Sequence, residues 1–147
     1  MQLFKHTTFI ARPRADVFAY FTDWSKGAEW RQYVKSMEQI DPGPIRPGTR
    51  VRFVIELLGE ETTYTLTVLT YDPPSLWRHN TGETNYGGYI EYRFDEEQGG
   101  TRVTFTCIIK PKTVLGWLAM PQMWLARGKS YRDQLPQLKH ALEEAGR

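Results

Sequence analysis

The 147-residue sequence predicts an α+β fold, in which a curved antiparallel sheet of roughly six to seven strands wraps around a long C-terminal helix. The first observation is a series of runs between Arg50 and Lys110 that alternate apolar and polar residues, as half-buried strands do. The second is a change of period after Val114, where apolar residues recur every three or four positions. No repeat or linker divides the chain, so we expect residues 1–147 to form a single domain.

The N-terminal region is expected to hold one strand and two short helices. Residues 3–11 alternate loosely and suit a first strand. Pro13 can begin a helix, because its missing N–H would be unpaired there, and the apolar residues up to Phe21 give that helix one buried face. A loop then leads into a second short helix that ends near Lys35.

Turn residues divide the middle of the chain into strands. Proline fixes φ and glycine accepts positive φ, so Pro47-Gly48 and Asp72-Pro73-Pro74 mark breaks, and Gly99-Gly100 is a hairpin signal. The strands expected between these breaks are residues 50–58, 62–71, 76–81, 89–94 and 101–110.

A long helix is expected to close the chain. Pro121 can open this helix, and Pro136 lies inside it, where we expect a kink or a loosened turn. The apolar stripe of the helix comprises Trp124, Gly128, Tyr131, Leu135, Leu138 and Leu142.

Composition excludes several classes of protein. A net charge of +2 gives no field strong enough to indicate nucleic acid as a partner. Cys107 is the sole cysteine and the histidines have no spacing typical of a metal triad, so we expect no disulfide, no metal and no cofactor. The opening residues lack a signal sequence, and a cytoplasmic location is expected.

The order of these landmarks resembles the START/polyketide-cyclase/pollen-allergen superfamily, often written SRPBCC. Residues 10–23 resemble its opening, in which an apolar strand end and a proline precede V-[WF]-x-[YF]-x-x-D, and Trp30 followed by Val34 resembles its next landmark. The later turns resemble it at residues 47–49, 72–74 and 99–104, and the closing helix does so at residues 135–143. This resemblance spans nearly the whole chain and implies a helix-grip fold. Because the superfamily includes lipid carriers, polyketide cyclases and hormone receptors, it implies no single activity.

We expect the long helix to cross the hollow of the sheet without filling it, which would leave an internal cavity. Ligand pockets are mostly apolar, with a few polar groups that fix orientation. The alternative is a solid core in which the same side chains pack together. The residues expected to line the cavity are Trp30, Phe53, Tyr64, Leu66, His79, Tyr92, Phe105, Met120, Trp124, Arg127 and Tyr131.

Two of these residues are candidates for chemistry, although neither is assigned a catalytic role. The imidazole of His79 titrates near neutrality and could transfer protons; alternatively, it is a structural histidine. Arg127 and Tyr131 could present a cation and a phenol on one helix face to a carboxylate or enolate oxygen. Alternatively, Arg127 is solvated and its stem covers Trp124.

Residues 114–125 are apolar almost throughout, and basic residues flank them on both sides. This segment could be a lid over the cavity, a surface that touches a membrane or another subunit, or ordinary core packing. Membrane contact is the least favoured of these.

Taken together, the residues and the resemblance favour a monomer or homodimer that binds a small hydrophobic or amphipathic ligand without catalysis. Such a ligand could be a lipid, an isoprenoid or an aromatic, polyketide-like molecule. One alternative is an enzyme of the polyketide cyclase/dehydratase type that acts on a bound aromatic substrate. Another is an interaction module that contacts a partner protein or a membrane through residues 114–125.

Overall fold

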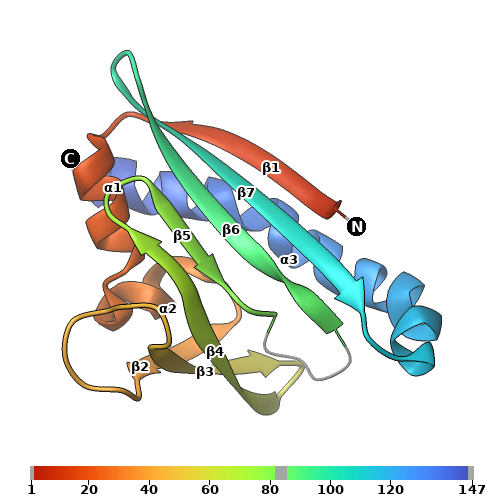
Figure 1. The fold of residues 1–147 in the computed structure, drawn as a ribbon. Coiled ribbons are helices and arrows are strands. Elements are labelled where there is room, and N and C mark those ends of the chain that lie inside the picture. The colour runs from red at the N-terminus through yellow and green to blue at the C-terminus, as the bar shows by residue number, and fades with distance from the viewer. Residues whose placement is uncertain (1, 82–85, 146–147) are drawn as a thin grey trace.

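The computed structural model describes residues 2–81 and 86–145 (Figure 1). The strands are β1 (Gln2–Ile10), β2 (Val34–Gln39), β3 (Arg50–Leu57), β4 (Glu60–Asp72), β5 (Leu76–His79), β6 (Tyr86–Glu97) and β7 (Gly100–Pro111). The helices are α1 (Arg14–Phe21), the short 3-10 helix η1 (Trp24–Lys26), α2 (Gly27–Trp30) and α3 (Val114–Ala145).

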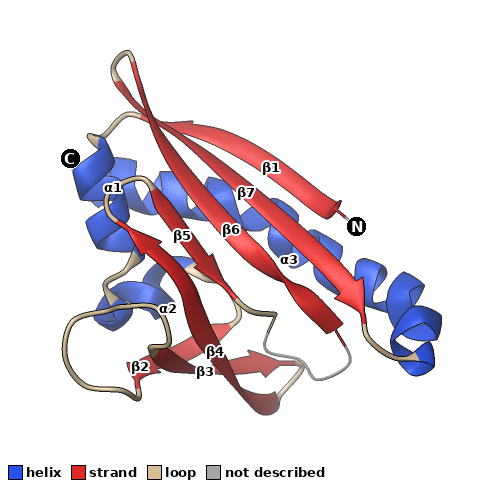
Figure 2. Ribbon diagram, in the orientation of Figure 1, coloured by secondary structure: helices blue, strands red, loops and turns tan. Residues whose placement is uncertain are grey.

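Within these residues the strands form one seven-stranded antiparallel sheet in the order β1-β7-β6-β5-β4-β3-β2. Strands adjacent in sequence from β2 to β7 pair with each other, and β1 adds to the far edge beside β7. Helix α3 runs along one face of the sheet, and α1 and α2 lie near one end of it (Figure 2). This arrangement confirms the predicted α+β class and the wrapping of a sheet around a C-terminal helix.

The second short helix was predicted wrongly. Helix α2 ends at Trp30, and Arg31 already has an extended backbone with φ −91° and ψ 106°. Residues 34–39, part of which was expected to be helical, form β2, in which Met37 pairs with Phe53 of β3. Pairing with β3 therefore decides the structure of this segment, and the local sequence pattern does not reveal that long-range pairing.

The start of the long helix was also predicted wrongly, because α3 begins at Val114 and Pro121 lies inside it. The hydroxyl of Thr113 accepts a hydrogen bond of 3.0 Å from the N–H of Gly116, which satisfies a free donor in the first turn. The helix continues through Pro136 to Ala145. None of the helices in the described ranges is long and apolar enough to cross a membrane.

The core lies between the β6–β7 part of the sheet and the helices α1 and α3. It is built largely of aromatic rings in contact. Phe21 of α1 lies 4.5 Å from Tyr92 between ring centroids, Tyr92 lies 5.2 Å from Phe105, and Phe105 lies 5.1 Å from Tyr131 of α3. Such aromatic pairs stabilise a core beyond the area that they bury. The rings therefore join both ends of the chain to the middle of the sheet.

Polar contacts fasten the end of α3 to β1. The ammonium of Lys139 donates to the carbonyl of Phe9 and to Oε2 of Glu143. The same Glu143 oxygen accepts from the backbone N–H of Ala11 at 3.0 Å. The first strand and the last helix are therefore joined both by apolar packing and by hydrogen bonds.

Candidate functional site

A group of polar side chains lies within the aromatic core, and four different elements supply it. Arg31 follows α2, His79 ends β5, Tyr92 lies in β6, and Gln134 lies in α3. The charge of Arg31 acts on both His79 and Tyr92, and Gln134 hydrogen-bonds to Tyr92. The fold therefore brings a cation, an imidazole, a phenol and an amide together in an otherwise apolar interior.

Arg31 is the most unusual member of this polar cluster. Its guanidinium carbon lies 3.9 Å from the centroid of the Trp30 ring and 5.3 Å from that of Phe21. Its Nη2 donates a long hydrogen bond of 3.5 Å to the carbonyl of Phe21, whereas Nη1 is buried and has no hydrogen-bond partner. Burial lowers the pKa of Arg31 to about 10, an effect that Tyr92 and Tyr20 oppose. No carboxylate among the described residues forms an ion pair with this buried cation.

His79 is held in one neutral form. Its Nδ1 accepts a hydrogen bond of 2.8 Å from the indole Nε1 of Trp77, so the proton of the neutral ring resides on Nε2. Burial, and secondarily the charge of Arg31, lower the pKa of His79 to about 3. Near neutral pH the ring can donate a hydrogen bond from Nε2, but it is a weak base.

Tyr92 and Tyr131 are neutral phenols. Burial raises the pKa of Tyr92 far above its usual range, although Arg31 and the hydrogen bond from Gln134 oppose this shift. Burial likewise raises the pKa of Tyr131, whose hydroxyl accepts a hydrogen bond of 3.2 Å from Nη1 of Arg127. The structure therefore joins Arg127 and Tyr131 on one helix face, as the sequence suggested.

Buried polar atoms without partners mark this interior. In folded proteins such atoms are few, and each needs a physical reason. In the described residues these atoms are Nε2 of His6, Nε1 of Trp30, Nη1 of Arg31 and Oε1 of Gln134. They include both donors and an acceptor.

Sequence reasoning missed Arg31, Gln134 and the unsatisfied nitrogen of His6. Arg31 was not singled out, because its burial depends on the guanidinium lying over the ring of Trp30, which is a tertiary contact. One signal was present in Gly27, since a Cβ atom there would lie 3.2 Å from Nη1 of Arg31 and would also press on Met37. The glycine leaves the room that the guanidinium occupies.

The residues predicted to line a cavity fall into three groups. Trp30, Leu66, Tyr92, Phe105 and Met120 are buried. Phe53, Tyr64, His79, Arg127 and Tyr131 are half-buried, and Phe53 stacks on Tyr64 at 5.6 Å. Trp124 is 51% exposed and stacks on Phe4 at 6.4 Å, at the rim of the core. The structure thus brings Tyr92, Phe105 and Tyr131 into contact and leaves Trp124 on the outer side.

A groove between α2 and α3 gives surface access to Arg31. Its volume is about 620 Å³. Trp30 at the end of α2 and Arg31 just after it line one side, and Asp133, Pro136 and Gln137 of α3 line the other. Since Arg31 also acts on His79 and Tyr92, this groove and the polar cluster share one side chain.

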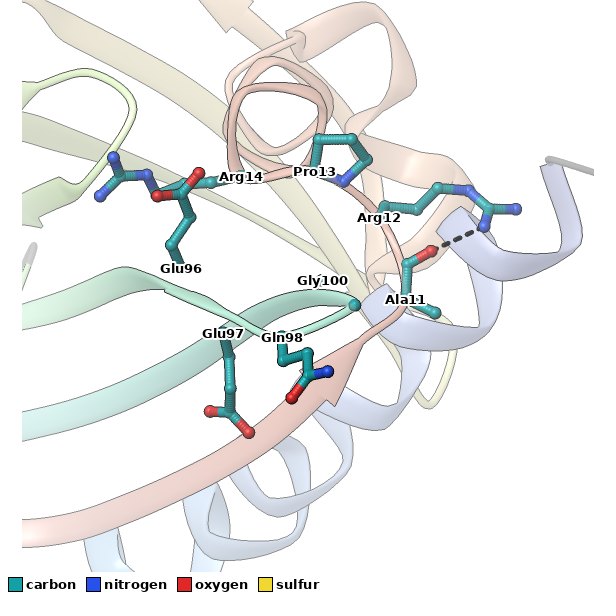
Figure 3. Close-up of a pocket in the computed structure, with 9 residues that line it drawn as sticks. Ala11, Arg12, Pro13, Arg14, Glu96, Glu97, Gln98 and Gly100 are labelled. Carbon is teal, nitrogen blue, oxygen red and sulfur yellow. Dashed lines mark hydrogen bonds between the residues drawn. The ribbon is translucent and has the colours of Figure 1, made fainter.

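A second depression lies beside the β6–β7 hairpin and the β1–α1 connection (Figure 3). Its volume is about 510 Å³, and charged side chains such as Arg14, Glu96 and Glu97 line it. Arg12 there donates a hydrogen bond of 2.8 Å to the carbonyl of Ala11. None of the cluster residues lines this depression, which resembles ordinary polar surface.

Metal binding and thiol chemistry find no support in the described part of the chain. No three His, Cys, Asp or Glu residues gather there in a way that could hold a metal ion. Cys107 is fully buried, and burial raises its pKa to about 12. A thiol of this kind is inert toward most reagents.

Comparisons with known proteins agree on the fold. Among curated protein sequences, none matches this chain. Of the solved structures, the protein TTHA0849 from Thermus thermophilus is 19% identical, with a TM-score of 0.76 over 97% of this chain and 98% of that chain. The Zhui aromatase/cyclase from Streptomyces sp. R1128 is 18% identical, with a TM-score of 0.76 over 98% and 94%. Ara h 8.0201 is 14% identical, with a TM-score of 0.63 over 86% and 92%.

The family comparison is the more specific one. A family described as polyketide cyclase/dehydrase and lipid transport matches residues 1–143, which is nearly the whole chain. This match confirms the resemblance inferred from the landmarks of the sequence. The protein therefore belongs to the polyketide cyclase/dehydrase and lipid transport family.

Proposed function

We propose that the protein binds a small, mainly apolar molecule that carries an acidic or carbonyl oxygen, and that it does not transform this molecule. The observation that carries the proposal is the buried guanidinium of Arg31, which has a free Nη1 and no carboxylate partner among the described residues. A buried charge is expensive unless it is paired. An oxygen of a bound guest would supply the missing partner.

The surroundings of Arg31 suit such a guest. The rings of Phe21, Trp30 and Tyr92 offer apolar contact area around the cation. The N–H of His79 and the amide of Gln134 could orient a polar group. A few polar groups in a mostly aromatic setting are typical of ligand pockets.

The acid–base properties of the interior support binding over catalysis. Proton transfer works best with groups that titrate near the working pH. Here the pKa of His79 is lowered to about 3, and that of Cys107 is raised to about 12. The second candidate function is that of an enzyme, because the fold is similar to that of an aromatase/cyclase. In such an enzyme Arg31 would stabilise an enolate oxygen of the substrate.

Two fluorescent probes test the proposal. 1-Anilinonaphthalene-8-sulfonate carries an anionic group, and N-phenyl-1-naphthylamine is the same skeleton without that group. We expect Arg31→Met to weaken binding of the sulfonate about tenfold or more, because it removes a charge-assisted hydrogen bond, and to leave binding of the neutral probe unchanged.

Two further variants give the controls. Arg31→Lys keeps the charge and should restore part of the affinity for the sulfonate. Arg127→Met removes a cation outside the cluster and should act on the two probes alike. If Arg31→Met binds both probes as tightly as the native protein does, the guanidinium does not receive the guest and the proposal fails.

A further inference from the structure

The first half of α3 presents large apolar side chains to solvent. Val114, Leu115, Leu118 and Leu125 are each more than two-thirds exposed, at 74%, 71%, 73% and 73%. Trp117 and Trp124 are 57% and 51% exposed. These six residues recur at helical spacing with Pro121 among them, and we call this surface the α3 apolar face. Exposed apolar patches of this kind on soluble proteins commonly mark sites of interaction.

The opposite side of the helix fixes this orientation. Gly116 and Met120 are buried against the sheet, and the carbonyl of Gly116 accepts a hydrogen bond of 3.0 Å from the hydroxyl of Tyr86. One turn past Trp124, the backbone of Gly128 lies close to the ring of Phe4. The helix cannot turn its apolar face inward without breaking these contacts. The exposure is therefore part of the fold.

Along the sequence, the charged residues next to the α3 apolar face are all basic up to Arg132. No Asp or Glu occurs between Gln98 and Arg132 in the sequence. Lys110 and Lys112 are exposed just before the helix, and Lys129 is exposed on the turn that follows Leu125. Arg132, one turn further, is also exposed and pairs with Asp133 at 3.7 Å. Positive side chains thus lie at both ends of the apolar face.

We propose that the α3 apolar face docks on the surface of an anionic lipid bilayer. Helices that lie in the interface bury leucine and tryptophan side chains at the boundary between headgroups and acyl chains. Tryptophan favours this region because its ring is apolar and its N–H is polar. Each lysine or arginine near an anionic surface adds attraction, and the long side chains can reach the headgroups while the apolar residues insert.

The combination of features favours a bilayer over a second copy of the chain. A bilayer offers a wide apolar region edged everywhere by negative headgroups, which matches apolar side chains bounded at both ends by cations. A second copy of the chain would instead bring like charges together at both ends, because its own α3 apolar face carries the same lysines. The docking requires no guest in the interior and can be tested without one.

Flotation with lipid vesicles tests this inference. The full chain is mixed with vesicles of phosphatidylcholine alone, or of phosphatidylcholine with phosphatidylglycerol, and then separated by density. We expect the chain to float with the anionic vesicles, to dissociate as salt is raised, and to show a blue shift of tryptophan emission when bound.

Exposed positions allow variants that leave the core intact. The double variant Leu115→Glu with Leu118→Glu should abolish flotation. Lys112→Glu with Lys129→Glu should weaken it at least about tenfold and reduce its dependence on salt. Leu69→Glu on β4 and Lys5→Glu on β1 are matched controls, since both residues are exposed away from α3, and neither should alter flotation.

Either of two results would overturn the inference. In the first, the chain floats equally with neutral and anionic vesicles, or with neither. In the second, sedimentation equilibrium gives a dimer that Leu118→Glu converts to a monomer, which would make the α3 apolar face an interface between copies of the chain. Far-UV circular dichroism of each variant confirms that it is folded.

Discussion

The indole Nε1 of Trp77 donates a hydrogen bond of 2.8 Å to Nδ1 of His79, and this contact sets the tautomer of the neutral imidazole. Both residues lie in β5, two positions apart, so they point to the same face of the sheet. Because Nδ1 is occupied as an acceptor, a proton that charges the ring must displace the indole. The buried setting and Arg31 oppose the same proton.

His79 should make the protein less stable in acid. Its folded pKa of about 3 lies below the ordinary value of 6.5, so the unfolded chain takes up the proton first as pH falls. The stabilisation is complete above about pH 6.5 and is lost as pH falls toward 3, with a slope of up to about 1.4 kcal/mol per pH unit. Urea titrations at about pH 7 and pH 5 should differ by about 2 kcal/mol from this group alone. His79→Asn should reduce the difference in stability between the two pH values, whereas the same substitution at the exposed His140 should leave it unchanged.

Arg31→Met should leave the free energy of unfolding unchanged or raise it by about 1 kcal/mol. Replacing a buried charge that has no ion-pair partner with an apolar side chain of similar length removes a desolvation cost. Arg78→Met is the opposite case, because Arg78 pairs with the buried Glu91 at 2.7 Å and its loss leaves that carboxylate only the longer contact with Arg93 at 3.8 Å. Thermal and urea unfolding of both variants measure this contrast. If Arg31→Met lowers the free energy of unfolding by about 2 kcal/mol or more, the guanidinium stabilises the fold and has a structural role.

Gly88→Ala should destabilise the protein much more than Gly48→Ala does. The two glycines have nearly the same backbone, with φ of +98° and +96°, so both substitutions incur a similar strain of about 1–2 kcal/mol. A Cβ atom at Gly88 would collide with the carbonyl of Ile108 in β7, whereas at Gly48 nothing lies within 4 Å. Urea unfolding of the pair isolates the cost of the collision. Equal losses would mean that β6 can move away from β7 at this point.

Cys107 should not react with a soluble disulfide reagent while the protein is folded. Its side chain is fully buried, and burial raises its pKa to about 12, so almost no thiolate forms near neutral pH. The reaction should proceed only as fast as the chain unfolds and should accelerate with urea. Rapid labelling in the absence of urea would reveal an opening of the sheet near β7.

Much of the fold follows from local patterns in the chain. The alternation within residues 101–110 and the turn at Gly99-Gly100 predicted the β6–β7 hairpin, because burial of one sheet face and a tight turn are local properties. The strand at residues 34–39 was missed, since its side chains alternate poorly and its pairing with β3 is a long-range contact. The start of α3 was missed because a proline often lies in the first turn of a helix, whereas Pro121 lies inside this one.

The candidate site was harder to predict than the fold. His79, Tyr92 and Tyr131 were among the residues expected to line the interior, because of their strand and helix positions and because ring side chains are often buried. Arg31 was not, because arginine is normally exposed and only the tertiary structure places its guanidinium between Trp30 and Phe21. The exposed face of α3 was ambiguous for the same reason, as an apolar run alone does not say which side meets the sheet.

The pairing of β1 with β7 has a consequence for biosynthesis. Strand β1 has no neighbour in the sheet until residues 101–108 have been translated, and the contacts of Phe9 and Ala11 with Lys139 and Glu143 form later still. Throughout that interval Phe4 and Ile10 of the nascent chain have no core to enter. Completion of this domain is therefore a late event that follows translation of its C-terminal helix.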